Sequence, residues 1–421
     1  MRNTTRAACT LALGLLGVAV TISVAPVAEA AKTSKAPAGP KMNPLVLKPL
    51  QAALEHGNAG KFPEAELELQ QADAVADKTP FEQFQVDELM GFVSLKQKKY
   101  DPAAKSYERG LESGLLAPEL VNDRLRLLSQ LFLQTQPRNL NKSGTYGKRW
   151  LEATGTRDPL MLGLVGQTAY FGDNFSEAST YMKEAVAISQ AAGQKPDENW
   201  LLILQSSYAK LKNSPGVVTA TTDLVRYYPR KEHWITLSQS LLAQAANKDR
   251  QILQVFRLLY QVDAMDTAED FTEAANVATS LGSPGEALKF MEKGYSSGIL
   301  TTSGDKAKNQ ALRAEAKRQA ETDEKSLPRF EKEALASQQG EVDVKLGEAF
   351  LSYDQPAKGL EAIQRGISKG GVKNPDEANL SLGRAQILAH NGAEAIKAFN
   401  LVKSPEYAQL AQLWTIYASQ L

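Results

Sequence analysis

Small and large apolar side chains recur along the chain at fixed helical spacings. The stretch "SPGEALKFMEKG", residues 283–294, has a small residue at Ala287, a large apolar one at Met291 and a second small one at Gly294. Spacings of four and three residues put these side chains on one face of a helix. Because small residues let a neighbouring helix approach closely and the large one fills the space between, the pattern predicts a helix packed against a partner helix.

The same pattern occurs five more times. Its members are Ala65, Leu69 and Ala72; Ala103, Tyr107 and Gly110; Ala178, Met182 and Ala185; Gly359, Ile363 and Gly366; and Ala395, Phe399 and Val402. Twelve residues before these patterns stands another small residue, at Ala53, Gly91, Gly166, Ala275, Gly347 and Gly383. The two sets predict helical hairpins, in which the earlier position belongs to the first helix and the later pattern to the second.

The hairpins follow one period over most of the chain. Successive first-helix positions are 38, 75, 109, 72 and 36 residues apart, which corresponds to one, two, three, two and one repeats of about 36 residues. The longer intervals leave room for degenerate repeats around 122–134, 199–211 and 232–244, and in the charged stretch after residue 300. In such an array each repeat buries its apolar face against its neighbours, so the chain length implies no particular number of globular domains.

These positions resemble the tetratricopeptide repeat (TPR), a hairpin of about 34 residues with an aromatic residue and Leu-Gly in its first helix and Ala, Phe and Ala in its second. "NLSLGRAQILAHNGAEAIKAF" matches at Gly383, Ala395 and Phe399, and Trp200 stands at the aromatic position of a weaker repeat. The resemblance covers residues 46–421. It implies an all-α fold, an α-solenoid of TPR-like helix-turn-helix repeats wound into a right-handed superhelix with the first helices along its concave face.

The repeats divide the chain into segments. We expect a TPR-like array over 46–300, a charged helical segment over 301–336, and C-terminal TPR-like repeats with a capping helix over 337–421. The charged segment has two interpretations, a solvated and eroded repeat, or a docking surface or hinge between two arrays. In the capping helix the residues expected to face inward are Leu410, Leu413, Trp414 and Tyr417.

The N-terminus carries the pattern of an export signal. Arg2 and Arg6 precede the apolar run "AACTLALGLLGVAVTISV", which ends in "APVAEA". This predicts a cleaved signal peptide over 1–30, a disordered linker over 31–45 and a periplasmic or secreted protein; the alternative is a transmembrane anchor. Because Cys9 is the only cysteine, the mature chain would have no disulfide and no thiolate metal site.

Charge and reactive groups exclude several functions. Removal of Arg2, Arg6 and Glu29 with the signal peptide leaves 46 basic and 47 acidic side chains, so the charge does not favour nucleic acid or an anionic membrane as a partner. No second apolar stretch approaches membrane length, so we expect no stable membrane insertion after cleavage. No nucleophile or zinc motif is present, and we expect no enzyme activity, metal or cofactor.

Two features could be mistaken for chemistry. The histidines His56, His233 and His390 lie far apart without partners at metal spacing, so we expect surface or capping residues. The segment "NKSGTYGKRW", residues 141–150, has too few residues between its glycines for a phosphate-binding loop and lacks Ser or Thr after its lysine, so we expect an inter-helix turn.

The remaining function is recognition of a protein or peptide partner. Polar and aromatic side chains that the repeat pattern places on the concave face are Gln167, Tyr170, Gln239, Asn276, Thr279, Glu348 and Arg384. The alternative interpretation is that these side chains are only exposed to water and bind no partner. Only Asn276 and Arg384 would suit capture of a C-terminal carboxylate, and their repeats are too far apart for it.

A second resemblance covers about 70 residues, from Arg226 to Leu300, with Trp234 after a Tyr-Pro and Lys-Gly at Lys293 and Gly294. This run is similar to exported repeat proteins that accompany TonB, ExbB and ExbD energy-transducing systems. The resemblance implies an accessory that binds the transducer or its receptor.

Three hypotheses follow. The first is a non-catalytic periplasmic protein-interaction scaffold, in its specific form an accessory of TonB-type energy transduction. The second is a chaperone-like assembly factor that binds outer-membrane or secreted clients. The third is a helical-superhelix enzyme acting on polysaccharide, which would need an apolar groove holding a carboxylate pair.

Overall fold

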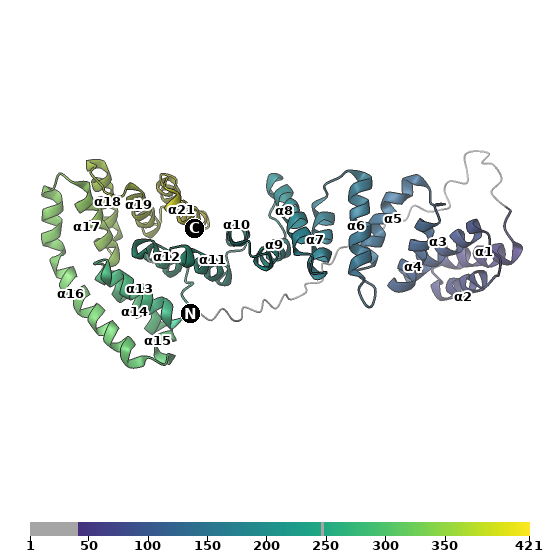
Figure 1. Ribbon diagram of the computed structural model, residues 1–421, viewed down its shortest axis with the longest axis horizontal. Coiled ribbons are helices and arrows are strands. Elements are labelled where there is room, and N and C mark those ends of the chain that lie inside the picture. Colours follow the sequence, from purple (N-terminus) through teal and green to yellow (C-terminus); the bar gives the residue numbers. More distant parts are fainter. Residues whose placement is uncertain (1–40, 246–247) are drawn as a thin grey trace. The chain divides into compact units, whose positions relative to one another are not determined.

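The computed structural model describes residues 41–245 and 248–421, and its regular elements there are 21 helices (Figure 1). The predicted all-α class is therefore confirmed. The expected signal peptide over 1–30 lies outside the described residues, as does the linker from 31 to 40; the first helix begins at Pro44, inside the range expected for the linker.

Most helices form consecutive hairpins. They are α1 (Pro44–Asn58) with α2 (Phe62–Asp73), α3 (Pro80–Lys96) with α4 (Tyr100–Glu112), α5 (Pro118–Leu131) with α6 (Leu140–Thr154), α7 (Pro159–Phe171) with α8 (Phe175–Ala191), α9 (Glu198–Lys210) with α10 (Ser214–Tyr227), α11 (Lys231–Gln244) with α12 (Asp249–Gln261), α13 (Ala268–Ser280) with α14 (Pro284–Ser296), α17 (Gly340–Ser352) with α18 (Pro356–Lys369), and α19 (Pro375–Leu388) with α20 (Gly392–Phe399). Outside these pairs are α15 (Ile299–Thr302), α16 (Lys306–Ala336) and α21 (Pro405–Ala418). Each of the two units is thus built from TPR-like helical hairpins, and α5, α9 and α11 are the first helices of the three degenerate repeats.

In seven of the hairpins, the turn is set by one left-handed residue after the first helix. It is Gly60, Lys98, Asp173, Lys212, Gly282, Asp354 or His390, with φ between 54° and 73°. The next backbone N–H donates to a carbonyl five residues before it, as from Asn391 to Gln386 at 2.8 Å. This is the 6→1 bond that closes a helix C-terminus, so the local backbone fixes where each second helix begins.

The predicted packing positions lie at the helix contacts. Every residue of the six patterns and their first-helix partners is buried. A Cβ on Gly91 would lie 2.7 Å from the ring of Tyr107, and one on Gly347 would lie 2.5 Å from Ile363. At these two positions the first helix needs glycine, because the large residue of the second helix occupies the space that a side chain would fill.

The expectation of a turn at residues 141–150 was wrong. This segment lies inside α6, and its two glycines face α7. A Cβ on Gly144 would lie 2.7 Å from Oγ1 of Thr168, and one on Gly147 would lie 2.7 Å from Val165. The glycines therefore allow close helix packing, which the search for a loop motif overlooked.

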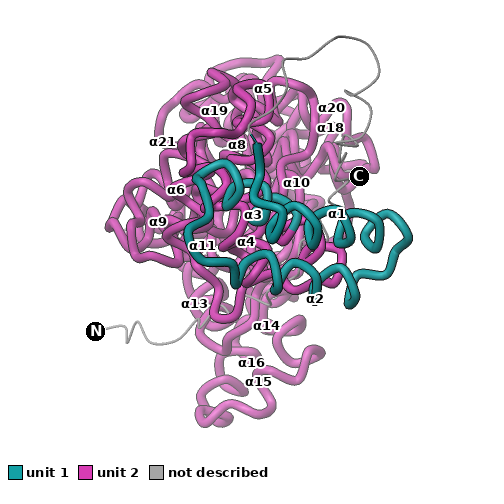
Figure 2. Tube along the Cα trace, turned by 90° about the vertical axis from the view of Figure 1, so that its right-hand side faces the viewer, with its two compact units in different colours: residues 1–89 teal, residues 90–421 magenta. Residues whose placement is uncertain are grey.

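The chain divides into two compact units, residues 1–89 and residues 90–421 (Figure 2). The described part of the first contains α1, α2 and the start of α3. Its buried side chains include Val46, Ala53 and Leu69. Glu82 accepts hydrogen bonds from the backbone N–H groups of Asn43 and Thr79, which lowers the pKa of its carboxyl.

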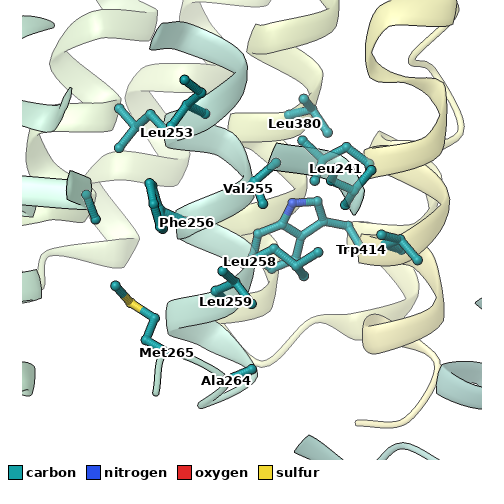
Figure 3. Close-up of a cluster of buried hydrophobic side chains, with 14 of the residues drawn as sticks. Leu241, Leu253, Val255, Phe256, Leu258, Leu259, Ala264, Met265, Leu380 and Trp414 are labelled. Carbon is teal, nitrogen blue, oxygen red and sulfur yellow. The ribbon is translucent and has the colours of Figure 1, made fainter. Parts of the chain in front are cut away.

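In the second unit, the C-terminal helix meets helices from far earlier in the sequence. The helix α21 packs against α10 and α12 as well as α19 and α20. The Gln420 side chain donates to the Val225 carbonyl at 3.1 Å, and Gln261 donates to the Tyr417 hydroxyl at 3.1 Å. Trp414 is 1% exposed and lies among side chains that include Val255 and Leu258 (Figure 3). The predicted burial of Leu410, Leu413 and Trp414 is confirmed, and Tyr417 is partly buried.

The charged segment is one continuous helix, α16, of 31 residues. It packs along α14, with smaller contacts to α13 and α17. Arg313 pairs with Glu292 of α14 at 2.5 Å, and the Tyr353 hydroxyl of α17 donates to Asp323 at 2.7 Å. The helix therefore replaces a hairpin at this point of the array and leaves one of its faces to solvent.

Among the helices of residues 41–245 and 248–421, none combines the length and the apolar character needed to cross a bilayer.

Candidate functional site

The structure places the seven predicted partner-binding residues in four separate regions of unit 2. Gln167 and Tyr170 lie on α7, and Gln239 lies on α11. Asn276 and Thr279 lie on α13. Glu348 on α17 and Arg384 on α19 come together.

Tyr170 is held between neighbouring first helices. Its hydroxyl is 2.8 Å from Ser206 Oγ of α9, and its ring packs edge-on against Phe171 and Phe175 with 5.6 Å between centroids. Both Tyr170 and Gln167 are half-buried. Tyr170 therefore contributes to packing between repeats, and its hydroxyl already has a partner.

The next two residues differ in exposure. Gln239 is exposed near the end of α11. Thr279 is half-buried, and its hydroxyl donates to the Ala275 carbonyl of its own helix at 2.8 Å. Of these two residues, Gln239 is the one that presents its polar side chain to solvent.

Glu348 and Arg384 belong to an ion cluster with Arg257 of α12 and Glu286 of α14. Arg257 donates to Glu286 at 2.7 to 3.1 Å and lies 3.5 Å from Glu348. Arg384 donates to Glu286 at 3.0 Å, and Ser381 donates to Glu348. The Arg257 and Glu286 side chains are 5% and 9% exposed, so these charges are screened little by water.

The two arginines hold Glu286 ionised. Burial alone would raise the pKa of this carboxyl, but the charges and hydrogen bonds of Arg257 and Arg384 lower it to about 2. Burial and repulsion by Arg257 lower the pKa of Arg384 to about 10, against the attraction of Glu286 and Glu348. The cluster therefore joins α12, α14, α17 and α19, and it occupies two of the predicted partner-binding residues with intramolecular bonds.

The predicted residues did not include Arg257 and Glu286, although one sequence signal points to them. Arg257 stands inside the apolar run "QILQVFRLLY". A charge among residues that are buried on several sides requires a partner, so such a position indicates a buried ion pair.

A pocket of about 390 Å³ lies between α13 and the start of α16 and includes the predicted residue Asn276. Its lining is Ala268, Glu269, Thr272 and Asn276 of α13, with Ser303, Asp305, Lys308, Asn309, Ala311, Leu312 and Glu315. Asn276 is exposed, so the pocket is open to solvent there. Eight of the eleven lining residues carry a polar or charged group, so the pocket can form hydrogen bonds and ion pairs with a ligand.

Asn309 is the most buried polar residue of the pocket, at 3% exposure. Its Nδ2 donates to Ser303 Oγ at 2.7 Å, which ties the start of α16 to the preceding turn. Because Asn309 lies in a charged segment outside the repeats, the repeat pattern could not indicate it as a site residue. Of the residues that line this pocket, the concave-face projection had named Asn276 alone.

The histidines differ from expectation at one position. His390 is exposed in a hairpin turn and His56 is half-buried, but His233 is 6% exposed, so its expected surface position was wrong. His233 Nε2 lies 3.5 Å from Glu198 Oε1, and burial lowers the pKa of the imidazole. Within the described ranges, no group of three or more His, Cys, Asp or Glu is arranged to hold a metal.

No family model and no curated protein sequence matches the chain. The chain is similar to solved structures that include MamA, with 11% identity and a TM-score of 0.31 over 48% of this chain and 94% of that one. The C-terminal part of a TPR repeat-containing protein from Cytophaga hutchinsonii shares 15% sequence identity with a TM-score of 0.33. The match covers 62% of this chain and 98% of that one. The TPR2AB domain of yeast Sti1, solved in complex with pHSP90, shares 11% sequence identity with a TM-score of 0.24. The match covers 72% of this chain and 100% of that one.

Proposed function

We propose that this protein is a non-catalytic scaffold that binds a protein partner, and that the pocket between α13 and α16 receives a short segment of that partner. The observation that carries the proposal is the pocket itself. It lies beside the exposed face of a first helix, where the repeat pattern places Asn276. Arrays of helical hairpins use this face to bind extended peptides or helices.

The size of the pocket suits a short segment. From Ala268 to Asn276 the lining extends over nine residues of α13, or about 12 Å at a rise of about 1.5 Å for each step between residues. An extended peptide advances about 3.3 Å per residue, so three to four residues fit along it. Asn276 and Thr272 offer hydrogen bonds to the peptide backbone.

The buried charges support binding rather than catalysis. A general acid needs a carboxyl whose pKa is raised toward neutrality. The buried carboxyl of Glu286 has its pKa lowered to about 2 instead, and both of its oxygens accept hydrogen bonds from arginine. The cluster is therefore suited to joining helices.

We further propose a periplasmic location and an accessory role in TonB-type energy transduction. The N-terminal pattern of Arg2, Arg6 and an apolar run supports export. The run from Arg226 to Leu300, which resembles accessory proteins of such systems, comprises α11 to α14 and so supplies the α13 side of the pocket.

The test is affinity capture from an envelope extract with wild type, with Asn276→Trp, which fills the pocket, and with Lys332→Trp, an exposed control on α16 outside it. We expect wild type and the control to capture the same transducer or receptor protein, and Asn276→Trp to lose it. Equal capture by all three would contradict a role for the pocket. Recovery of many unrelated outer-membrane clients would favour the chaperone-like alternative.

A further inference from the structure

His233 is buried at the contact between two neighbouring first helices. It is the third residue of α11, is 6% exposed, and its Nε2 lies 3.5 Å from Glu198 Oε1 at the start of α9. Within residues 41–245 and 248–421, neither of these two atoms has a hydrogen-bond partner. Because a buried polar atom without a partner is costly, the protonation state of the imidazole decides how favourable this contact is.

The segment that leads into α11 lies on the start of α9 through further contacts. The Tyr228 hydroxyl donates to the Pro196 carbonyl at 2.8 Å, and the Lys195 ammonium lies 3.6 Å from the centroid of the Tyr228 ring. Arg230 donates to Oε2 of Glu198. We call these residues the α9–α11 joint; they are Lys195, Pro196, Glu198, Tyr228, Arg230 and His233.

Three features of the joint disfavour a charged imidazole. His233 is buried, it lies in the first turn of α11, where the helix dipole opposes a cation, and Arg230 is a cation beside it. Glu198 and Glu232 favour the charge, but Glu198 is already paired with Arg230. Burial is the largest of these effects, so the pKa of the His233 imidazole is lowered from its ordinary value of 6.5.

The helices α10 and α12 also pack against α11, and the charges at their C-terminal ends are paired. On α10, Asp223 and Arg226 lie 3.8 Å apart, and Asp263, which follows α12, pairs with Lys293 at 2.9 Å. Burial raises the pKa of Asp223, so its protonation in acid acts on stability in the opposite direction from that of His233. A loss of stability on mild acidification therefore points to His233.

From this geometry we infer that the α9–α11 joint is acid-sensitive: it holds while His233 is neutral and loosens when the imidazole takes up a proton. A protonated His233 would be a buried cation next to Arg230, whereas a histidine released into water carries its charge without that cost. Because each repeat packs on its neighbours, loosening lets the hairpin of α11 and α12 turn against that of α9 and α10. The inference is independent of the proposed function, although the joint lies one repeat before the pocket.

The opened joint binds a proton at a higher pH than the closed joint, because only the closed joint lowers the pKa of His233. The stabilisation from the joint is therefore fully present above pH 6.5 and is lost as the pH falls through the lowered pKa. Glu286, by contrast, contributes to acid sensitivity only from pH 4.5 downward, so a loss that begins near neutrality does not come from the ion cluster.

The first test is hydrogen exchange by mass spectrometry between about pH 8 and 5, corrected for the pH dependence of the chemical exchange rate. In wild type, protection of the first turns of α9 and α11 should fall by up to about tenfold for each pH unit below 6.5. His233→Gln, which stays neutral, should show no such fall, and His390→Gln, an exposed control, should behave as wild type. Protection that falls in parallel in wild type and His233→Gln would overturn the inference.

Proton NMR of the imidazole ring gives a second test that needs no change at His233. In untagged protein, the double variant His56→Gln, His390→Gln leaves His233 as the only histidine. Its ring signals should titrate with a midpoint below pH 6.5. Adding Glu198→Gln should lower the midpoint further, because the carboxylate nearest the imidazole is removed. A midpoint at or above 6.5 in the double variant would exclude an acid-sensitive joint.

Discussion

At the scale of single residues, each of the six repeats that follow the sequence pattern has one first-helix position occupied by glycine or alanine. Gly383 is the clearest case, because a Cβ there would overlap the ring of Phe399. That ring is 1% exposed and stacks on Trp414 with 5.8 Å between centroids, so it has little room to move. The small residue of the first helix and the large residue of the second are therefore one packing unit.

We predict that Gly383→Ala destabilises the protein by about 1–3 kcal/mol, the usual cost of adding a methyl group to a filled core. Gly304→Ala is the matched control, because a Cβ there meets no atom within 4 Å and its φ is not positive. Urea unfolding followed by circular dichroism measures both midpoints. If both variants unfold at the same urea concentration, the first-helix glycine is not needed for packing.

At the scale of elements, helices that are far apart in sequence are joined by the cluster of Arg257, Glu286, Glu348 and Arg384. We predict that Glu286→Gln lowers the free energy of unfolding by about 3–5 kcal/mol, because it leaves two buried arginines facing one remaining carboxylate. Glu333→Gln, which breaks an exposed pair with Arg329, should cost under about 0.5 kcal/mol. Similar losses in the two variants would contradict a central role for the cluster.

The lowered pKa of Glu286 predicts that the stability of the folded protein depends on pH in the acidic range. The pKa of Glu286 is lowered from its ordinary value of 4.5 to about 2 in the folded protein. Its contribution is fully present above pH 4.5 and is lost as the pH falls toward 2, because the unfolded chain binds the proton first. Thermal midpoints should therefore fall more steeply between pH 4.5 and 2 for wild type than for Glu286→Gln. Parallel curves would show that Glu286 is not the titrating group.

At the scale of the whole second unit, α21 completes a core that begins at Val225. We predict that a chain ending after Lys403 loses hydrogen-exchange protection in α10 and α12, which pack on α21 although they lie more than 140 residues earlier. The helices α7 and α8, which pack against each other and against α6 and α9, should exchange as before. Loss confined to α19 and α20 would mean that α21 caps only its sequence neighbours.

The pattern of small and large residues predicted the hairpins well, because helix packing within a hairpin depends on residues four to twelve positions apart. Closure of α21 onto α10 and α12 was not predictable in this way, since it results from small rotations accumulated over several repeats. For the same reason, Glu348 and Arg384 were placed on a concave face without their partners Arg257 and Glu286. The pocket itself was not predictable from the repeats, because Asn276 follows the repeat pattern whereas Asn309 lies in a helix outside it.

The most direct test of the scaffold proposal is photo-crosslinking in cells from a benzoylphenylalanine at position 276, on the rim of the pocket, with position 332 as the exposed control on α16. The account predicts one defined protein adduct from position 276 and none from position 332. Absence of any adduct at position 276, or the same adducts from both positions, would contradict binding of a partner in this pocket.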